Sequence, residues 1–169
     1  MVIAPRRGPG YARKNYIVIT QVDTSRVGLG RFVCHELAHY WSMHANSSGP
    51  DNWMNEGFAE FVSAQFIRDV VDSTAYLAIV ESWRKGGENQ LPIWTPTATR
   101  RPTAGVSYRK APHALVQLEE RIVRQRMQRI LQRYMAEPMS TTPALLRLIG
   151  EVAGESEAAW FREVLARGS

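Results

Sequence analysis

Apolar residues recur at two different spacings along the chain, and each spacing predicts a type of element. Residues 16–22 (YIVITQV) form a short segment rich in β-branched residues, which is typical of one strand in a small sheet. From about residue 28 to 44 the apolar positions recur with a period of about 3.6, which predicts a helix buried on one side. The apolar positions on that side are Leu29, Phe32, Val33, Leu37, Tyr40 and Trp41.

Turn residues divide the rest of the chain into further helices. Residues 46–50 (NSSGP) predict a turn, after which Asp51 or Asn52 can cap a second helix that runs to about residue 71. A third, shorter helix is expected over residues 73–84. Helices then resume near Tyr108, break at Pro138 and Gly154, start again at Thr141-Thr142-Pro143, and end with a helix over about residues 156–166. The predicted fold class is mainly α with a small β element.

Between the third helix and Tyr108, residues 86–105 combine Gly, Pro, Thr and Arg without periodicity. A loop of that length inside a compact domain is usually functional or mobile. The chain as a whole has 169 residues, of which 44% are hydrophobic and 22% charged, as expected for one globular domain over residues 1–169. No stretch approaches the roughly 18 apolar residues of a membrane span, so we expect no transmembrane segment.

The net charge of +5 is concentrated in the second half of the chain. Arginines between residues 121 and 133 alternate with apolar residues at helical spacing, which favours the polar face of an amphipathic helix. No aromatic interleaving or nucleic-acid module accompanies them, so nucleic acid is not the expected partner. One cysteine, Cys34, cannot form an intramolecular disulfide, and the N-terminus lacks the apolar segment of a signal peptide, which favours a cytoplasmic location.

The candidate chemistry lies in His35-Glu36-Leu37-Ala38-His39, which is an H-E-x-x-H metalloprotease motif. Residues four apart lie one turn apart on the same face of a helix, so His35 and His39 can close on one metal ion. Neutral imidazoles suit zinc, and the neighbouring carboxylate of Glu36 can take a proton from a metal-bound water. A hydrogen-bonded histidine pair without a metal is the alternative interpretation.

A catalytic zinc needs a third protein ligand and an open position. A metzincin would carry glycine and histidine where this chain has Ser42 and Ala45, so that class is excluded. The next helix begins with the segment WMNEGFAE, in which Glu56 is expected to face the histidines. Glu60 lies one turn further on, where it can accept a hydrogen bond from a histidine ring and fix its tautomer, or can belong to a solvated stripe.

These two blocks, HELAHYW and WMNEGFAEF, resemble the gluzincin family of zinc aminopeptidases, the aminopeptidase N and leukotriene hydrolase group. That family has HELAHQW followed by WLNEGFAEF. Sixteen residues separate His39 from Glu56 here, against eighteen in the family, and the difference falls in the Ser/Gly/Pro turn. The resemblance implies a thermolysin-like zinc peptidase catalytic domain, with one zinc held by His35, His39 and Glu56.

The likeness covers roughly residues 30–166. The segment GVSYRKA resembles the Y-E-K-G block of the family, and this implies that the hydroxyl of Tyr108 stabilises the oxyanion. Residues 1–34 contain nothing similar to the family's Gly-x-Met-Glu-Asn strand, which recognises the free amine of the substrate, and Asp23 is the only acid there. The chain is therefore either an excised core or a minimal relative with altered specificity.

Zinc-dependent hydrolysis of a peptide or protein substrate is the expected function, with Glu36 as general base. A zinc-containing scaffold or partner-binding domain without catalysis is the alternative, because the amine-binding motif is missing. The sequence leaves the oligomeric state open.

Overall fold

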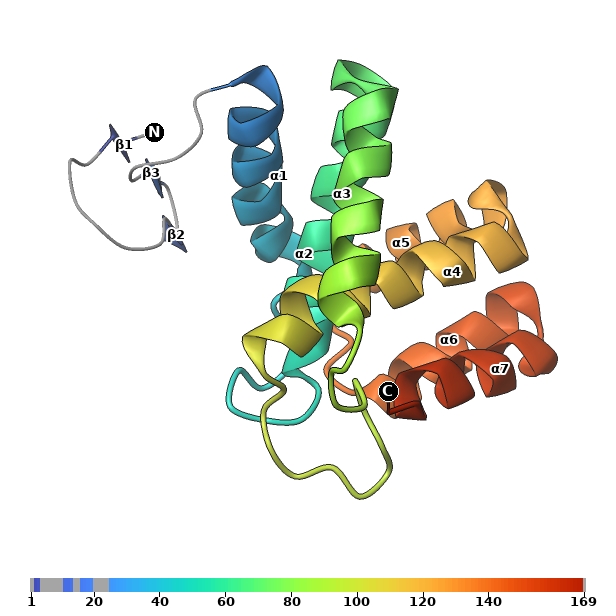
Figure 1. Cartoon of the computed structure of the whole chain (residues 1–169). Helices are drawn as coiled ribbons and strands as arrows, with labels where there is room; N and C mark the ends of the chain where they lie inside the picture. Colours follow the sequence, from blue (N-terminus) through green and yellow to red (C-terminus); the bar gives the residue numbers. More distant parts are fainter. Residues whose placement is uncertain (1, 4–10, 14–15, 20–24, 169) are drawn as a thin grey trace.

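A computed structural model describes residues 2–3, 11–13, 16–19 and 25–168. Its first part is a small sheet with strand order β1-β3-β2. Strand β1 (Val2–Ile3) pairs parallel with β3 (Tyr16–Ile19), and β2 (Tyr11–Arg13) pairs antiparallel with β3. Figure 1 shows this sheet beside a much larger helical part, which confirms the predicted mainly α class with a small β element. Residues 20–22 of the expected strand, and Asp23, lie outside the described residues.

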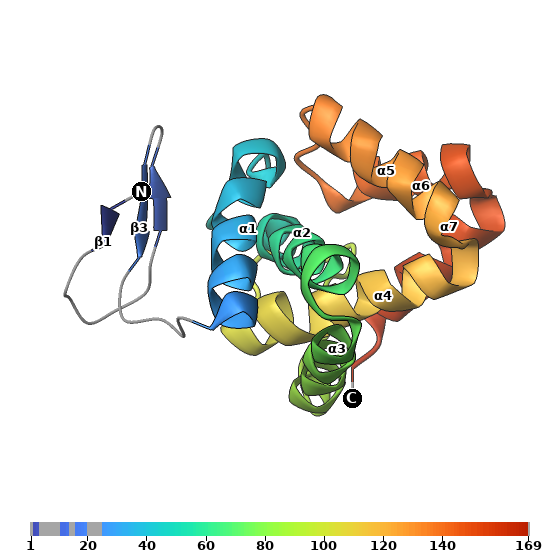
Figure 2. The ribbon, with the colours of Figure 1, turned by 90° about the horizontal axis from the view of Figure 1, so that it is seen from above.

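Two helices form the framework of the molecule. Helix α1 (Arg26–Ser42) begins at Ser25, whose side chain accepts a hydrogen bond of 3.0 Å from the backbone N–H of Gly28. Helix α2 (Asn52–Phe66) returns after a nine-residue connector, residues 43–51. Viewed from above, α2 lies between α1 and the later helices (Figure 2). Eleven of the fifteen residues of α2 are buried, so α2 is the central helix of the fold.

The exposed side of α1 differs from the sequence prediction. Leu37, Tyr40 and Trp41 were expected on the buried face, but their exposed fractions are 40%, 44% and 50%. The residues that α1 buries are Glu36, Ala38 and Ser42. The buried face of α1 therefore carries polar and small side chains, and the large apolar side chains of Leu37, Tyr40 and Trp41 lie on the other side.

The helix predicted to run to residue 71 changes its winding near its end. Helix α2 stops at Phe66, and residues Ile67–Val71 form a π-helical turn, η1. Helix α3 (Ser73–Gly87) follows directly, capped by the Asp72 carboxylate, and it extends three residues beyond the predicted end at residue 84. Of the loop expected over residues 86–105, residues 86–87 belong to α3 and residues 104–105 are already helical. A second π-helical turn, η2 (Val106–Lys110), follows directly.

The amphipathic helix expected across residues 121–133 is interrupted at Val123, although residues 124–136 form such a helix. Helix α4 (Ala111–Ile122) ends at Val123, whose φ of 64° reverses the chain before α5 (Arg124–Ala136) begins. Three of the arginines are held by carboxylates of other elements: Arg121 by Glu157, Arg124 by Asp69 and Arg133 by Glu151. Intramolecular ion pairs thus account for much of the basic stripe.

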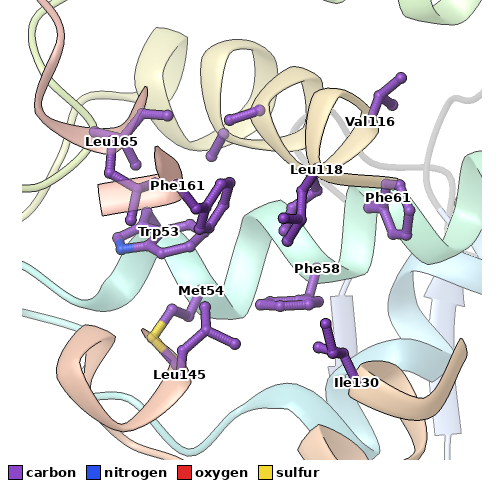
Figure 3. Packing of buried hydrophobic residues seen from close by; sticks show 14 of the residues in the cluster. Trp53, Met54, Phe58, Phe61, Val116, Leu118, Ile130, Leu145, Phe161 and Leu165 are labelled. Carbon is purple, nitrogen blue, oxygen red and sulfur yellow. The ribbon is translucent and has the colours of Figure 1, made fainter. Parts of the chain in front are cut away.

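Helices α6 (Thr142–Ala153) and α7 (Glu155–Ala166) complete the chain, and they break at Gly154 as predicted. The core fills the space between α2 and helices α4 to α7, and Figure 3 shows Phe58 and Phe61 of α2 directed into it. The rings of Phe58 and Tyr134 stack with centroids 4.0 Å apart. Gly57 permits the close approach of α2 to α4, because a Cβ there would lie 3.0 Å from the Cβ of Ala111.

Candidate metal centre

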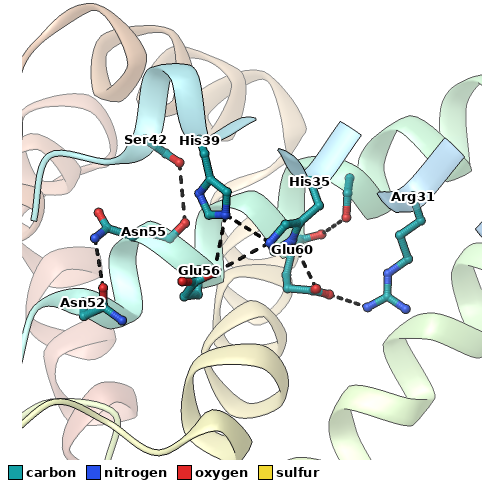
Figure 4. Close-up of polar contacts among 9 residues, drawn as sticks. Arg31, His35, His39, Ser42, Asn52, Asn55, Glu56 and Glu60 are labelled. Carbon is teal, nitrogen blue, oxygen red and sulfur yellow. Dashed lines mark hydrogen bonds and ion pairs between the residues drawn. The ribbon is translucent and has the colours of Figure 1, made fainter. Parts of the chain in front are cut away.

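The antiparallel pairing of α1 and α2 brings the predicted ligands together. The Nε2 atoms of His35 and His39 lie 3.1 Å apart, and Glu56 Oε2 lies 3.6 Å from the first and 3.5 Å from the second. Figure 4 shows the three side chains converging from the two helices. Within the described ranges, these residues form a group of metal-ligating side chains close enough to share one ion.

The triangle of donor atoms fits zinc. Zinc bound at about 2.0–2.1 Å in tetrahedral geometry places its ligand atoms about 3.3–3.4 Å from one another. The three separations here, 3.1, 3.5 and 3.6 Å, surround that value. Glu56 Oε2 is buried without a hydrogen-bond partner among the described residues, which is costly for a carboxylate oxygen unless a cation meets it. A histidine pair that is only hydrogen-bonded would leave this oxygen unsatisfied.

The pKa values of the two imidazoles are shifted in opposite directions. Burial opposes a charge on His35, but the neighbouring Glu56 and Glu60 outweigh it and raise the pKa of His35 to about 9. Burial and the positive charge on His35 lower the pKa of His39 to about 4. Despite burial, contacts with His35 lower the pKa values of Glu56 and Glu60. Without metal, the His35 imidazole is therefore positively charged at neutral pH and the His39 imidazole is neutral.

Glu60 connects the cluster to an arginine that the sequence analysis did not single out. Its Oε1 lies 3.2 Å from Nδ1 of His35, although outside the angular range of a hydrogen bond, and its Oε2 is paired with Arg31. The guanidinium of Arg31 also lies 5.6 Å from the centre of the Trp83 ring. Arg31 stands four residues before His35, as His35 stands four before His39, so helical periodicity could have revealed it.

Glu36 and Tyr108 come from different elements, α1 and η2. Glu36 is buried on α1, with 7% of its surface exposed. Tyr108, from the η2 turn, stacks on the His35 ring with centroids 6.0 Å apart and an angle of 20° between the planes. Burial and the negative charge of Glu56 raise the pKa of the Tyr108 hydroxyl, while Arg101 opposes that rise. The hydroxyl is therefore protonated at neutral pH and can donate a hydrogen bond.

A buried asparagine next to Glu56 fixes the connector between α1 and α2. The side chain of Asn55 accepts a hydrogen bond of 3.2 Å from the backbone N–H of Ala45 and donates one of 3.0 Å to the Ala45 carbonyl. It also donates to the Asn52 side chain. Its satisfied polar groups hold α2 in register with the end of α1. The sequence analysis did not single out this residue.

The start of α2 is also tied to a distant part of the chain. Asp51, expected to cap α2, makes no such bond and instead accepts hydrogen bonds from the backbone N–H and hydroxyl of Thr142 at the start of α6. The Trp53 indole N–H donates to the same Thr142 hydroxyl at 2.9 Å. These hydrogen bonds attach the start of α2, the helix that carries Glu56, to the start of α6.

No helix in the described part of the chain is long and apolar enough to cross a membrane. A hollow of about 560 Å³ lies between α5 and α6, where none of the six predicted site residues contributes to it. A second pocket, of about 400 Å³, lies under the loop that precedes Tyr108.

Comparison with known proteins identifies the fold. The family model described as "Peptidase family M1 domain" matches residues 12–156, and no curated protein matches. The structure of an M1 zinc metallopeptidase from Deinococcus radiodurans superimposes with a TM-score of 0.73 at 22% identity, over 99% of this chain and 38% of that one. A mutant of the same description, bound to a Tyr-Ser-Ala substrate, gives a TM-score of 0.75 at 21% identity, over 99% and 39%. The chain thus spans less than half the length of these structures.

Proposed function

Because this chain belongs to peptidase family M1, we propose that it hydrolyses peptide bonds with zinc held by His35, His39 and Glu56. The observation that carries the proposal is the triangle of two imidazole nitrogens and one buried carboxylate oxygen at the tetrahedral spacing of zinc. When bound, zinc lowers the pKa of a coordinated water to about 7 and polarises the scissile carbonyl.

The side chains of this chain supply the rest of the chemistry. Glu36 takes the proton of the attacking water and passes it to the leaving amine, as a buried carboxylate on the ligand helix can. The protonated hydroxyl of Tyr108 donates a hydrogen bond to the oxygen on which negative charge develops. Glu60, whose Oε1 lies 3.2 Å from Nδ1 of His35, would orient this ring as a ligand when zinc is bound.

The test combines metal analysis with a hydrolysis assay on one preparation. The wild-type chain is expected to carry about one zinc and to cleave a peptide, whereas Glu36→Gln retains the zinc and the fold but loses hydrolysis. Glu120→Gln, on the exposed side of α4, is the matched control and keeps both. Hydrolysis that survives in Glu36→Gln removes Glu36 from the proposed role.

A non-catalytic zinc scaffold is the second candidate. The ligands join the central helix α2 to α1, so a metal there also stabilises the helix pair. Zinc content without hydrolysis, together with a lower melting temperature after chelation, would favour this function over peptidase activity.

A further inference from the structure

The ammonium group of Lys110 joins three segments that are far apart in the sequence. Its Nζ donates hydrogen bonds of 2.9 and 3.1 Å to the carbonyls of Gln90 and Leu91, which follow α3, and one of 2.8 Å to the carbonyl of Arg167, which follows α7. An ammonium group has three N–H donors, so these contacts use all of them. Lys110 therefore attaches the η2 turn to both segments.

The acceptors of Lys110 are main-chain carbonyls, which distinguishes it from Lys85. The Lys85 side chain is exposed on α3 and pairs with the carboxylate of Glu81, a contact that solvent screens. A hydrogen bond from a charged donor is stronger than one between neutral groups, and a main-chain acceptor moves only with the backbone. Lys110 thus fixes the path of the backbone rather than the position of another side chain.

The loop segment that Lys110 contacts is itself attached to the core. Next along the chain, the backbone N–H groups of Ile93 and Trp94 donate to the carbonyl of Leu165 in α7, at 2.9 and 3.1 Å. All three of these side chains are buried. The carbonyls that receive the Lys110 ammonium group therefore belong to a segment held in place by other contacts.

The same turn carries Tyr108, two positions before Lys110. The backbone N–H of Ala111 donates to the carbonyl of Val106, and this bond closes the π-helical turn around both residues. The Tyr108 ring stacks on His35, with centroids 6.0 Å apart and an angle of 20° between the planes. The backbone that presents Tyr108 to the proposed metal centre is thus the backbone that Lys110 attaches to the loop and to the end of α7.

The end of α3 confines η2 from another side. A Cβ at Gly87 would lie 3.2 Å from the Cα of Lys110. A Cβ at Gly86 would lie 3.1 Å from Cγ and Cδ of the Arg109 side chain. A long side chain can turn away from such a contact, whereas a backbone atom moves only with its turn. Gly87 therefore permits the close approach of α3 to the backbone of η2.

We propose that Lys110 is a positioning residue, which holds η2 where the Tyr108 hydroxyl meets the oxygen that becomes negatively charged during hydrolysis. The proposal rests on the proposed peptidase function, and Lys110 itself touches no reacting atom. A donor to an oxyanion contributes only if it is already in place, and a misplacement of about 1 Å can cost about 10²-fold in rate. Lys110 therefore acts on the reaction through Tyr108.

Steady-state kinetics of Lys110→Met in two backgrounds test this role. In the otherwise wild-type chain the substitution should lower kcat by about 10–100-fold and leave KM and zinc content unchanged. In the Tyr108→Phe chain it should cause less than about a twofold further loss, because the hydroxyl that it positions is already absent. Lys110→Arg should retain part of kcat, since it keeps a charged donor.

Lys85→Met is the matched control and should keep the wild-type kcat, because its contact is an exposed ion pair within α3. A wild-type kcat in Lys110→Met would overturn the proposal. The same fold loss in both backgrounds would overturn it as well, because Lys110 would then support the fold in general. A loss of activity that follows a loss of zinc would have the same meaning.

Gly87→Ala provides the decision if Lys110→Met does not fold. Its Cβ would press on the backbone of η2, so it should lower kcat in the wild-type background and cause little further loss with Tyr108→Phe. Gly86→Ala, which meets only the flexible Arg109 side chain, should cause a smaller loss. Equal losses in the two glycine variants would overturn the proposal, because the contact with the η2 backbone would then not matter.

Fluorine NMR of the metal-free chain, labelled with meta-fluorotyrosine, follows Tyr108 without hydrolysis. Tyr108→Phe identifies the resonance by its loss. Lys110→Met should shift this resonance and leave that of Tyr134, which is buried in the core, in place. Such a shift in a chain that cleaves no peptide supports the positioning, and only the proposed function then fails. An unshifted resonance overturns the positioning even in an active peptidase.

Discussion

Arg31 of α1 forms an ion pair with Glu60 of α2, one helical turn from the contact between His35 and Glu56. At these two turns the helices meet through groups of opposite charge. Because Glu60 contacts both Arg31 and the His35 ring, Arg31 acts on the metal ligands through Glu60. This relationship leads to a ranking of metal affinities.

We expect Glu56→Gln to weaken zinc binding more than Glu60→Gln, whose loss should be about 10–100-fold, as for other groups that orient a ligand. Arg31→Met should weaken binding less than Glu60→Gln does. In the double variant of Arg31 and Glu60 the two losses should not add, because both act through the same contact. Competition with a chromogenic chelator measures the zinc affinities of these four variants, of the wild type and of the control. Glu120→Gln is the control, and equal affinities for Glu56→Gln and wild type would remove Glu56 from the site.

The two imidazoles should give the metal-free chain a characteristic dependence of stability on pH. The pKa of His35 is raised to about 9 when folded, so its contribution is complete below about pH 6.5 and is lost as the pH rises toward 9. The pKa of His39 is lowered to about 4, so its contribution is present above about pH 6.5 and is lost as the pH falls toward 4. These two groups together should place a stability maximum near pH 6.5.

Thermal melts of the metal-free chain between pH 5 and 9 measure this dependence. Glu60→Gln removes one of the carboxylates that raise the pKa of His35, so it should flatten the alkaline side of the curve. A melting temperature that rises steadily from pH 6.5 to 9 would contradict the assignment of the proton to His35.

Replacement of Tyr108 by phenylalanine should lower kcat by about 10²–10³-fold, the usual loss for one oxyanion donor, while KM changes little. The stacking of the ring on His35 does not need the hydroxyl, so zinc content should stay at the wild-type level. Tyr40→Phe, a tyrosine on the exposed side of α1, serves as the control. Full activity of the Tyr108 variant would show that oxyanion stabilisation comes from another group.

The chain is not expected to require a free N-terminal amine on its substrate. An ammonium group in a partly dehydrated cleft needs a fixed carboxylate opposite it, and Glu36, Glu56 and Glu60 already have other proposed roles. Two peptides that differ only in N-acetylation should therefore be cleaved at similar rates. If the free peptide reacts at least a hundredfold faster, an amine site exists, and Asp23→Asn is the first variant to examine.

The sequence indicated the residues of the site on α1 and α2, but it did not indicate the long-range contacts that hold these helices in place. His35 and His39, and likewise Glu56 and Glu60, were expected on one face of their helix, because residues four apart lie one turn apart. The partners Asp51 and Thr142 stand 91 positions apart, and no local pattern indicates such a contact.

Other deviations have equally specific causes. The reversal at Val123 requires a positive φ that β-branched residues rarely adopt, so neither turn propensity nor periodicity predicts it. The exposed Leu37 and Trp41 show that apolar periodicity locates a helix but does not decide which of its faces is buried.

The hydrogen bonds from Thr142 to Asp51 set an order of events during synthesis. All the proposed ligands lie within residues 35–56, so the α1–α2 hairpin can leave the ribosome as a local unit. The carboxylate at the start of α2, however, stays unmatched until the chain has been translated through residue 142. The metal-binding hairpin is thus an early, low-contact-order unit, and its final alignment depends on the C-terminal helices, which arrive last.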